Sequence, residues 1–239
     1  MRWSVTRAVR SLLVKVRAAW TLVGLVASFA AAASAHAQGI VSGRVAMQEK
    51  PGQTTKDFDG TVIFLMSKGA PLHFAETKMQ MAMNGRQFTP HVRVVTTGST
   101  VEFDNQDPFS HNIFSTAPGA AFDLGTYGSG VTKSTQFKKA GAFPVYCNIH
   151  AQMTSFVVVV STPHFTQAGP DARWKIAAVP AGKYELHVWH ERAPEVIEAI
   201  DVPAAGLANV DVTLDARGFK QIAHKDKLGK DYSAHGVRY

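Results

Sequence analysis

The single cysteine of the chain lies in a short segment with two other side chains that can bind metal ions. From residue 147 to residue 153 the segment reads Cys-Asn-Ile-His-Ala-Gln-Met, so a thiol, an imidazole and a thioether recur at every third residue. An alternating apolar run precedes it at 142–147, and a β-branched run follows it at 154–160. These runs predict antiparallel strands joined by a short hairpin loop. Such a loop can turn the side chains of Cys147, His150 and Met153 towards one point.

A second imidazole comes from His111, in a distant segment of strand character at 110–114. Two imidazoles and a thiolate in one plane, with a weak axial thioether, form the ligand set of a blue-copper electron-transfer centre. A thiolate suits both Cu(I) and Cu(II), and a weakly bound thioether tunes the reduction potential. Since four protein ligands leave no open position for a substrate, we expect an electron carrier rather than an enzyme.

Other interpretations of this segment remain open at the level of the residues. Cys147, His150 and Met153 could be ordinary core residues, since a buried cysteine packs as a small apolar side chain. A zinc site would favour a closed tetrahedral donor set without a thioether. A Cys–His nucleophile pair would need an open cleft and an oxyanion hole, and no motif in the sequence marks either.

Further methionines and histidines lie outside this segment. Met79, Met81 and Met83 alternate on one face of a predicted strand. Such a stripe can pack in a core or hold Cu(I) during loading, which gives an alternative role in periplasmic copper storage or delivery. Six histidines lack partner spacing and are expected to be structural or at the surface: His73, His91, His164, His187, His190 and His224.

The segment from 85 to 160 resembles a small cupredoxin of the plastocyanin and amicyanin kind. The resemblance is carried by Phe88-x-Pro90, Gly98-x-x-Val101-x-Phe103-x-Asn105-x-Asp107, His111-Asn112 and Cys147-x-x-His150-x-x-Met153, in that order. The two-residue gap between the last two ligand positions is similar to that of amicyanin, whereas plastocyanins have a longer one. The wider pattern also resembles plastocyanin-like proteins of methylamine utilisation, in which a cupredoxin is combined with a carboxypeptidase-regulatory-like sandwich.

The resemblance implies one mononuclear type 1 copper in a Greek-key β-sandwich. The implied copper ligands are His111, Cys147, His150 and Met153. It also implies that Asn112 ties the two ligand loops together. The implied activity is single-electron transfer with a redox protein such as a c-type cytochrome or a dehydrogenase, in methylamine or related amine oxidation.

The resemblance also implies a docking surface. In cupredoxins the histidine of the ligand loop commonly reaches the surface through an apolar rim. We expect Phe109, Pro118 and Ile149 to form such a patch around His150, for transient contact with a redox partner.

The first 37 residues are a predicted secretory signal peptide. They contain five basic and no acidic residues, an apolar run at 18–33 and a small-x-small pattern ending at Ala37. The apolar run is shorter than the roughly 20 residues that cross a bilayer as a helix. We therefore expect cleavage before Gln38, a periplasmic product and no membrane span after cleavage. From residue 38 onwards, 20 basic and 18 acidic residues nearly balance, which excludes a broad basic face for nucleic acid.

Short alternating runs separated by turn residues predict an all-β fold from 39 to 215. Residues 76–161 make the predicted cupredoxin domain. Residues 38–75 and 162–216 flank it and resemble the carboxypeptidase-regulatory-like module, a second small β-sandwich that would be discontinuous in sequence. Residues 194–200 allow a short helix. Residues 217–239 are predicted to be a basic, polar and loosely ordered tail.

Overall fold

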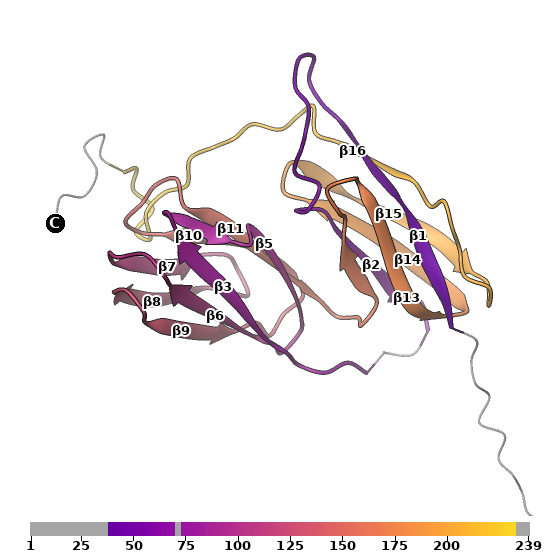
Figure 1. The fold of residues 1–239 in the computed structure, drawn as a ribbon, viewed down its shortest axis with the longest axis horizontal. Helices are drawn as coiled ribbons and strands as arrows, with labels where there is room; N and C mark the ends of the chain where they lie inside the picture. Colours follow the sequence, from indigo (N-terminus) through magenta and orange to yellow (C-terminus); the bar gives the residue numbers. More distant parts are fainter. Residues whose placement is uncertain (1–37, 70–72, 233–239) are drawn as a thin grey trace, which may run out of the picture. The chain divides into compact units, whose positions relative to one another are not determined.

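Every regular element in the computed structural model, which describes residues 38–69 and 73–232, is a β-strand (Figure 1). The predicted all-β class is therefore confirmed. The predicted signal peptide lies outside the described residues. Within 38–69 and 73–232 there is no apolar helix of the length that a membrane crossing requires.

The first β-sandwich is built from the strands between residues 78 and 160. One sheet has the strand order β5-β11-β10-β7-β8 and the other has the order β4-β3-β6-β9. The strands are β3 (Lys78–Asn84), β4 (Gln87–Thr89), β5 (Val92–Thr96), β6 (Thr100–Asn105), β7 (His111–Ser115), β8 (Phe122–Tyr127), β9 (Thr132–Gln136), β10 (Gly141–Cys147) and β11 (Thr154–Val160).

Alternation along these strands sends every second side chain into one apolar core. Val101 and Phe103 of β6, with Val145 of β10 and Val157 of β11, are fully buried in it. Cys147 lies at the edge of the same core, at the last residue of β10. The core thus holds the end of the strand from which the ligand loop starts.

The second β-sandwich takes strands from both sides of the first in sequence. Its sheets have the orders β13-β1-β16 and β12-β2-β14-β15. The strands are β1 (Gln38–Gln48), β2 (Val62–Ser67), β12 (Phe165–Gln167), β13 (Arg173–Pro180), β14 (Gly182–His190), β15 (Ala193–Val202) and β16 (Val212–Asp215). Residues before β3 and after β11 therefore share sheets, as in the parallel pairing of Val45 with Val212.

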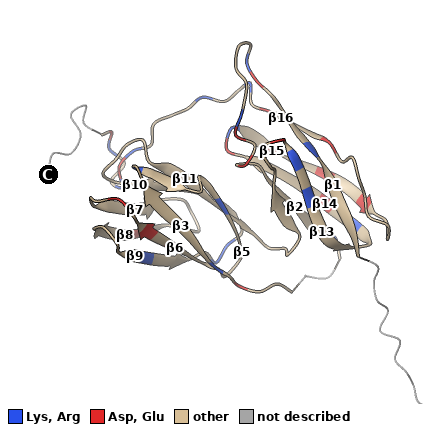
Figure 2. Ribbon diagram, in the orientation of Figure 1, with Lys and Arg blue, Asp and Glu red and all other residues tan. Residues whose placement is uncertain are grey.

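Basic and acidic residues both occur along the strands of the two sandwiches, as the colours of Figure 2 show. In β13, for example, Arg173 and Lys175 are exposed while Trp174 and Ile176 are buried. This alternation of charged and apolar residues is the signal from which the strands were predicted.

The predicted short helix at 194–200 is wrong, because these residues belong to β15. Their spacing of apolar side chains also fits the outer strand of a sheet. Val196 pairs with Val188 of β14 and Ile200 pairs with Tyr184, so the backbone hydrogen bonds are made between strands rather than within a helix.

Of the predicted tail at 217–239, the structure describes the residues up to 232. Residues 219–232, defined here as the C-terminal segment, contain no strand. Asp226 closes a turn by accepting hydrogen bonds from the backbone N–H groups of Leu228 and Lys230, at 2.9 and 2.8 Å. Further along, the hydroxyl of Tyr232 donates to the carbonyl oxygen of Cys147 at 2.8 Å. Polar contacts rather than apolar periodicity hold this segment in place.

Candidate metal centre

Three side chains that can bind a metal meet at one end of the first sandwich. The sulfur of Cys147 lies 3.6 Å from Nδ1 of His111 and 3.6 Å from Nδ1 of His150. Cys147 and His111 are fully buried, whereas His150 is half-buried. Across 38–69 and 73–232, this is the one group of three or more His, Cys, Asp or Glu residues close enough to hold a metal ion.

Two strands and one loop bring these residues together. His111 is the first residue of β7 and Cys147 is the last residue of β10, and Cys147 pairs with Ile113. The ligand loop, residues 148–153, then leads into β11. The loop is closed by backbone bonds from N–H of Met153 to O of His150, at 3.0 Å, and from N–H of Cys147 to O of Met153, at 3.2 Å. The predicted hairpin loop is therefore present.

Asp107 determines which nitrogen of His111 faces the sulfur. Its Oδ2 lies 2.9 Å from Nε2 of His111, and both side chains are almost completely buried. Its carboxylate also accepts the backbone N–H groups of Gly85 and Arg86. Burial opposes the charge of Asp107, but these hydrogen bonds outweigh burial and hold the pKa of the carboxyl below its ordinary value. An ionised Asp107 keeps the proton on Nε2, so Nδ1 presents a lone pair towards Cys147.

The protonation states of the three groups follow from burial. Burial lowers the pKa of His111, against the opposing effect of Asp107. Burial lowers the pKa of His150 as well, and the nearby His111 adds to this effect. Burial raises the pKa of the Cys147 thiol, although backbone N–H groups of Ile149, Asn112 and His150 oppose it. The imidazoles are thus held neutral, as metal ligands must be, and a metal ion would displace the thiol proton.

The spacing of the three donors fits a shared metal ion. Donors about 2.0 and 2.3 Å from one ion, set 120° apart, would lie about 3.7 Å from each other. The two observed sulfur-to-nitrogen separations of 3.6 Å match this value. One thiolate and two imidazoles also form a donor set that suits copper in both of its common oxidation states.

Comparison with known proteins gives matches to solved structures only. No family model and no curated protein matches the chain. A copper-containing nitrite reductase from Thermus scotoductus SA-01 has 25% identity and a TM-score of 0.34, covering 38% of this chain and 24% of that chain. A purple cupredoxin from Nitrosopumilus maritimus has 22% identity and a TM-score of 0.31, covering 34% and 98%. The Cu(I) form of an amicyanin variant has 24% identity and a TM-score of 0.34, covering 43% and 100%.

These matches leave the function of the chain undecided, because each TM-score is well below 0.5. The chain spans about a quarter of the length of the matched nitrite reductase. What the site can do therefore depends on its own residues.

Met153 and Asn112 are the other two residues predicted for the site. Met153 is 1% exposed and packs in the same core cluster as Cys147. Asn112 does link the two ligand segments, but through its backbone carbonyl, which accepts the N–H of Asn148 at 2.8 Å. Its side chain instead donates to Oδ1 of Asp123 at 2.6 Å. The link between the ligand segments that was predicted for Asn112 is thus made by its main chain.

The surface around His150 contains two of the three predicted rim residues. The ring of Phe109 lies 5.5 Å from that of His150, and Ile149 precedes His150 in the loop. Pro118, however, follows β7 at the end opposite His111. A methyl group built on its neighbour Gly119 would lie 3.9 Å from the ring of Phe143, near the start of β10. Pro118 is therefore not part of a patch around His150.

The methionine stripe is mostly inside the core. Met81 and Met83 are fully buried, and Met79 is partly buried. The hydroxyl of Ser155 donates to the sulfur of Met81 at 3.5 Å. Packing is thus the role that the structure gives to Met81 and Met83.

None of the other histidines within 38–69 and 73–232 belongs to the metal group. His91 pairs with Glu191, and His187 pairs with Glu195 and stacks on Phe64. His224 is different, because its ring stacks on Tyr146, the residue before Cys147, with ring centroids 4.4 Å apart.

Sequence reasoning missed Asp107 and Tyr232. Asp107 is the last residue of the cupredoxin-like motif that begins at Gly98, and it lies four residues before His111. The sequence therefore did carry a signal for its role. Tyr232 is 85 residues from Cys147 and carries no such signal.

Proposed function

We propose that this chain binds one type 1 copper ion and carries single electrons. The ligands would be His111, Cys147, His150 and Met153. One observation carries the proposal: a buried thiol stands 3.6 Å from each of two imidazole nitrogens, and Asp107 turns the lone pair of one of them towards the sulfur. Met153 is buried in the same core cluster as Cys147, which supports a thioether as the fourth ligand.

A bound copper ion would supply a one-electron couple between Cu(II) and Cu(I). One electron enters from a donor and one leaves to an acceptor, with no bond or proton exchanged. The chain contributes a fixed set of donors, because β7 and β10 are joined by backbone pairing at the ligands. Burial of Cys147 and His111 excludes water, and His150 provides an edge that reaches the surface.

We further propose that the chain is exported to the periplasm and exchanges electrons with a c-type cytochrome or a dehydrogenase, in methylamine or related amine oxidation. The half-buried His150 with Phe109 and Ile149 beside it supports docking at this edge. Ile149→Asp should slow electron exchange with a c-type cytochrome without changing the visible spectrum. Stopped-flow mixing of the reduced chain with oxidised cytochrome measures this rate. Pro118→Asp is the matched control and should leave it unchanged, and equal rates for both variants would place docking elsewhere.

Copper titration of the chain tests the proposed function. The chain without residues 1–37 should bind one Cu(II) and develop an intense visible absorption band from thiolate-to-copper charge transfer. Ascorbate should bleach this band, and reoxidation should restore it. A colourless protein that binds only Cu(I), and loses it to a chelator, would instead support copper storage or delivery.

A further inference from the structure

The C-terminal segment lies against the backbone that carries the proposed copper ligands. The hydroxyl of Tyr232 donates to the carbonyl oxygen of Cys147 at 2.8 Å. The backbone N–H of Lys227 donates to Oδ1 of Asn148 at 2.9 Å. The last residue of β10 and the first residue of the ligand loop are therefore held by a segment about 80 residues away in sequence.

Further contacts fix the C-terminal segment in this position. Nζ of Lys227 lies 2.6 Å from Oδ2 of Asp123, a carboxylate that also accepts the side chain of Asn112. The ring of His224 stacks on Tyr146 with an angle of 17° between the planes, and Tyr232 packs edge-on against His224.

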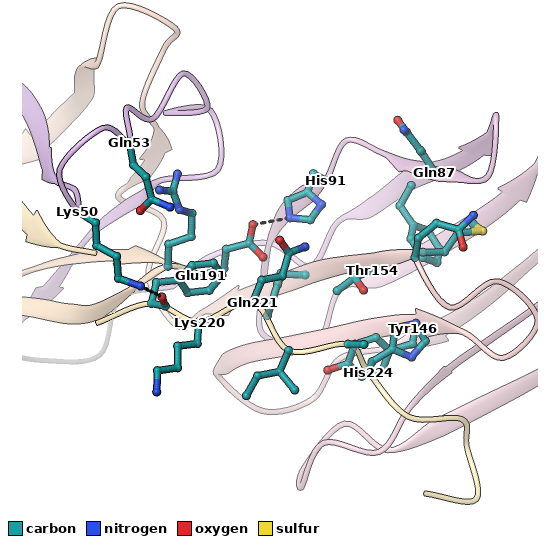
Figure 3. Close-up of a pocket in the computed structure, with 18 residues that line it drawn as sticks. Lys50, Gln53, Gln87, His91, Tyr146, Thr154, Glu191, Lys220, Gln221 and His224 are labelled. Carbon is teal, nitrogen blue, oxygen red and sulfur yellow. Dashed lines mark hydrogen bonds and ion pairs between the residues drawn. The ribbon is translucent and has the colours of Figure 1, made fainter. Parts of the chain in front are cut away.

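The segment is attached at its other end as well. Nζ of Lys50 donates to the carbonyl oxygen of Phe219 at 2.9 Å. Figure 3 shows His224 beside Tyr146, with Lys50 at the opposite end of a cleft that the segment lines. With both ends held, the segment can restrain the ligand loop rather than merely touch it.

The restrained backbone controls the surroundings of the sulfur. The N–H of Ile149 points at Sγ of Cys147, with nitrogen and sulfur 3.4 Å apart. The direction of that N–H depends on how the Cys147 carbonyl and the Asn148 side chain are held, because both precede it in the chain. Hydrogen bonding around the cysteine sulfur tunes the reduction potential of a type 1 copper site.

We propose that Tyr232 is a positioning residue, which fixes the backbone at Cys147 and Asn148 so that the N–H of Ile149 stays directed at the thiolate. The effect on reduction potential rests on the proposed copper function. The effect on the thiol itself does not require a metal.

Tyr232→Phe tests this by removing one hydroxyl from a half-buried ring. Weakening the N–H contact makes the sulfur a stronger donor to Cu(II), so the reduction potential should fall and the visible band should shift. In the metal-free chain, Cys147 should react with a thiol reagent more slowly at neutral pH, by up to about fivefold, because losing one hydrogen bond of ordinary strength destabilises the thiolate form that reacts. Tyr184→Phe is the matched control, since Tyr184 makes the same kind of bond, at 2.9 Å, to the carbonyl of Pro180 in the second sandwich.

The results separate this proposal from the copper proposal. If the chain binds no copper, but its Tyr232→Phe variant reacts more slowly at Cys147 than the Tyr184→Phe variant does, the positioning role stands and the copper function is removed. A blue Tyr232→Phe protein with wild-type potential would overturn the positioning role. Equal thiol reactivity of wild type and Tyr232→Phe would overturn it as well. Lys227→Gln, which loses the ion pair to Asp123, should shift both quantities in the same direction as Tyr232→Phe.

Discussion

Single side chains determine what the candidate site can bind. The carboxylate of Asp107 accepts three hydrogen bonds, from the backbone N–H groups of Gly85 and Arg86 and from Nε2 of His111. It therefore sets both the tautomer and the ring orientation of His111, which contacts Cys147 only through Nδ1. Outer carboxylates of this kind raise the basicity of a histidine ligand and hold it in place.

Asp107→Asn should weaken Cu(II) binding by about 10- to 100-fold, since an amide cannot supply the same charge and must turn its NH₂ group towards one donor. Competition with a chelator of known affinity measures the change. The control is Asp104→Asn, because Asp104 accepts hydrogen bonds from Thr132 and Gln106 outside the metal group. Equal affinity of the two variants would show that Asp107 does not position His111.

At the scale of the element, the position of β3 decides between core packing and Cu(I) binding as the role of the methionine stripe. Its pairing with β6 turns Met81 and Met83 into the core, and Met79 is left at the margin. A Cu(I) carrier site needs sulfur atoms that an ion can reach, and complete burial of two of the three argues for packing.

Met81→Ala should lower the free energy of unfolding by about 2–5 kcal/mol, because it leaves a cavity in a fully buried position. Met79→Ala should lower the free energy of unfolding clearly less, because Met79 is only partly buried. Urea unfolding of the two variants measures the difference. Neither substitution should change the rate at which the folded chain takes up Cu(I). Slower uptake by Met79→Ala would instead support a function in copper storage or delivery.

Most of these elements could be predicted from local sequence patterns. The long-range polar contacts could not. The ligand loop could be predicted because strand-like apolar runs end at Cys147 and begin again at Thr154, with potential metal ligands at every third residue between them. Residues 194–200 fit a helix equally well by spacing, and only pairing with β14 decided between the two. The position of Tyr232 depends on one hydrogen bond to a distant carbonyl, for which composition and periodicity give no signal.

At the scale of the whole chain, residues of both sandwiches meet in one apolar cluster. Val62 of β2 packs there with Val92 of β5 and Val158 of β11. Beside the cluster, Nε2 of His91 lies 2.7 Å from Oε1 of Glu191. Figure 3 marks this pair with a dashed line. The hydrogen bond to Glu191 raises the pKa of His91, although burial opposes the shift.

This pair should make stability depend on pH in a defined direction. Since the folded state raises the pKa of His91 above 6.5, its contribution is complete below pH 6.5 and is lost as the pH rises through the folded value. Glu191→Gln should therefore destabilise the chain more at pH 5.5 than at pH 8.5, measured by urea unfolding. The same loss at both values would show that protonation of His91 does not strengthen the pair. In a His91→Gln background, Glu191→Gln should lower the free energy of unfolding little further.

The central claim is that Cys147 is the thiolate ligand of a copper centre, and the visible spectrum of copper-loaded Cys147→Ser tests it most directly. The buried substitution should cost only a few kcal/mol, so the variant should fold, which circular dichroism verifies. We expect the wild type to show an intense visible band at one equivalent of Cu(II) and the variant to lose it, together with reversible reduction by ascorbate. An intense band that survives in Cys147→Ser, or a wild type that binds Cu(II) without one, would contradict the account.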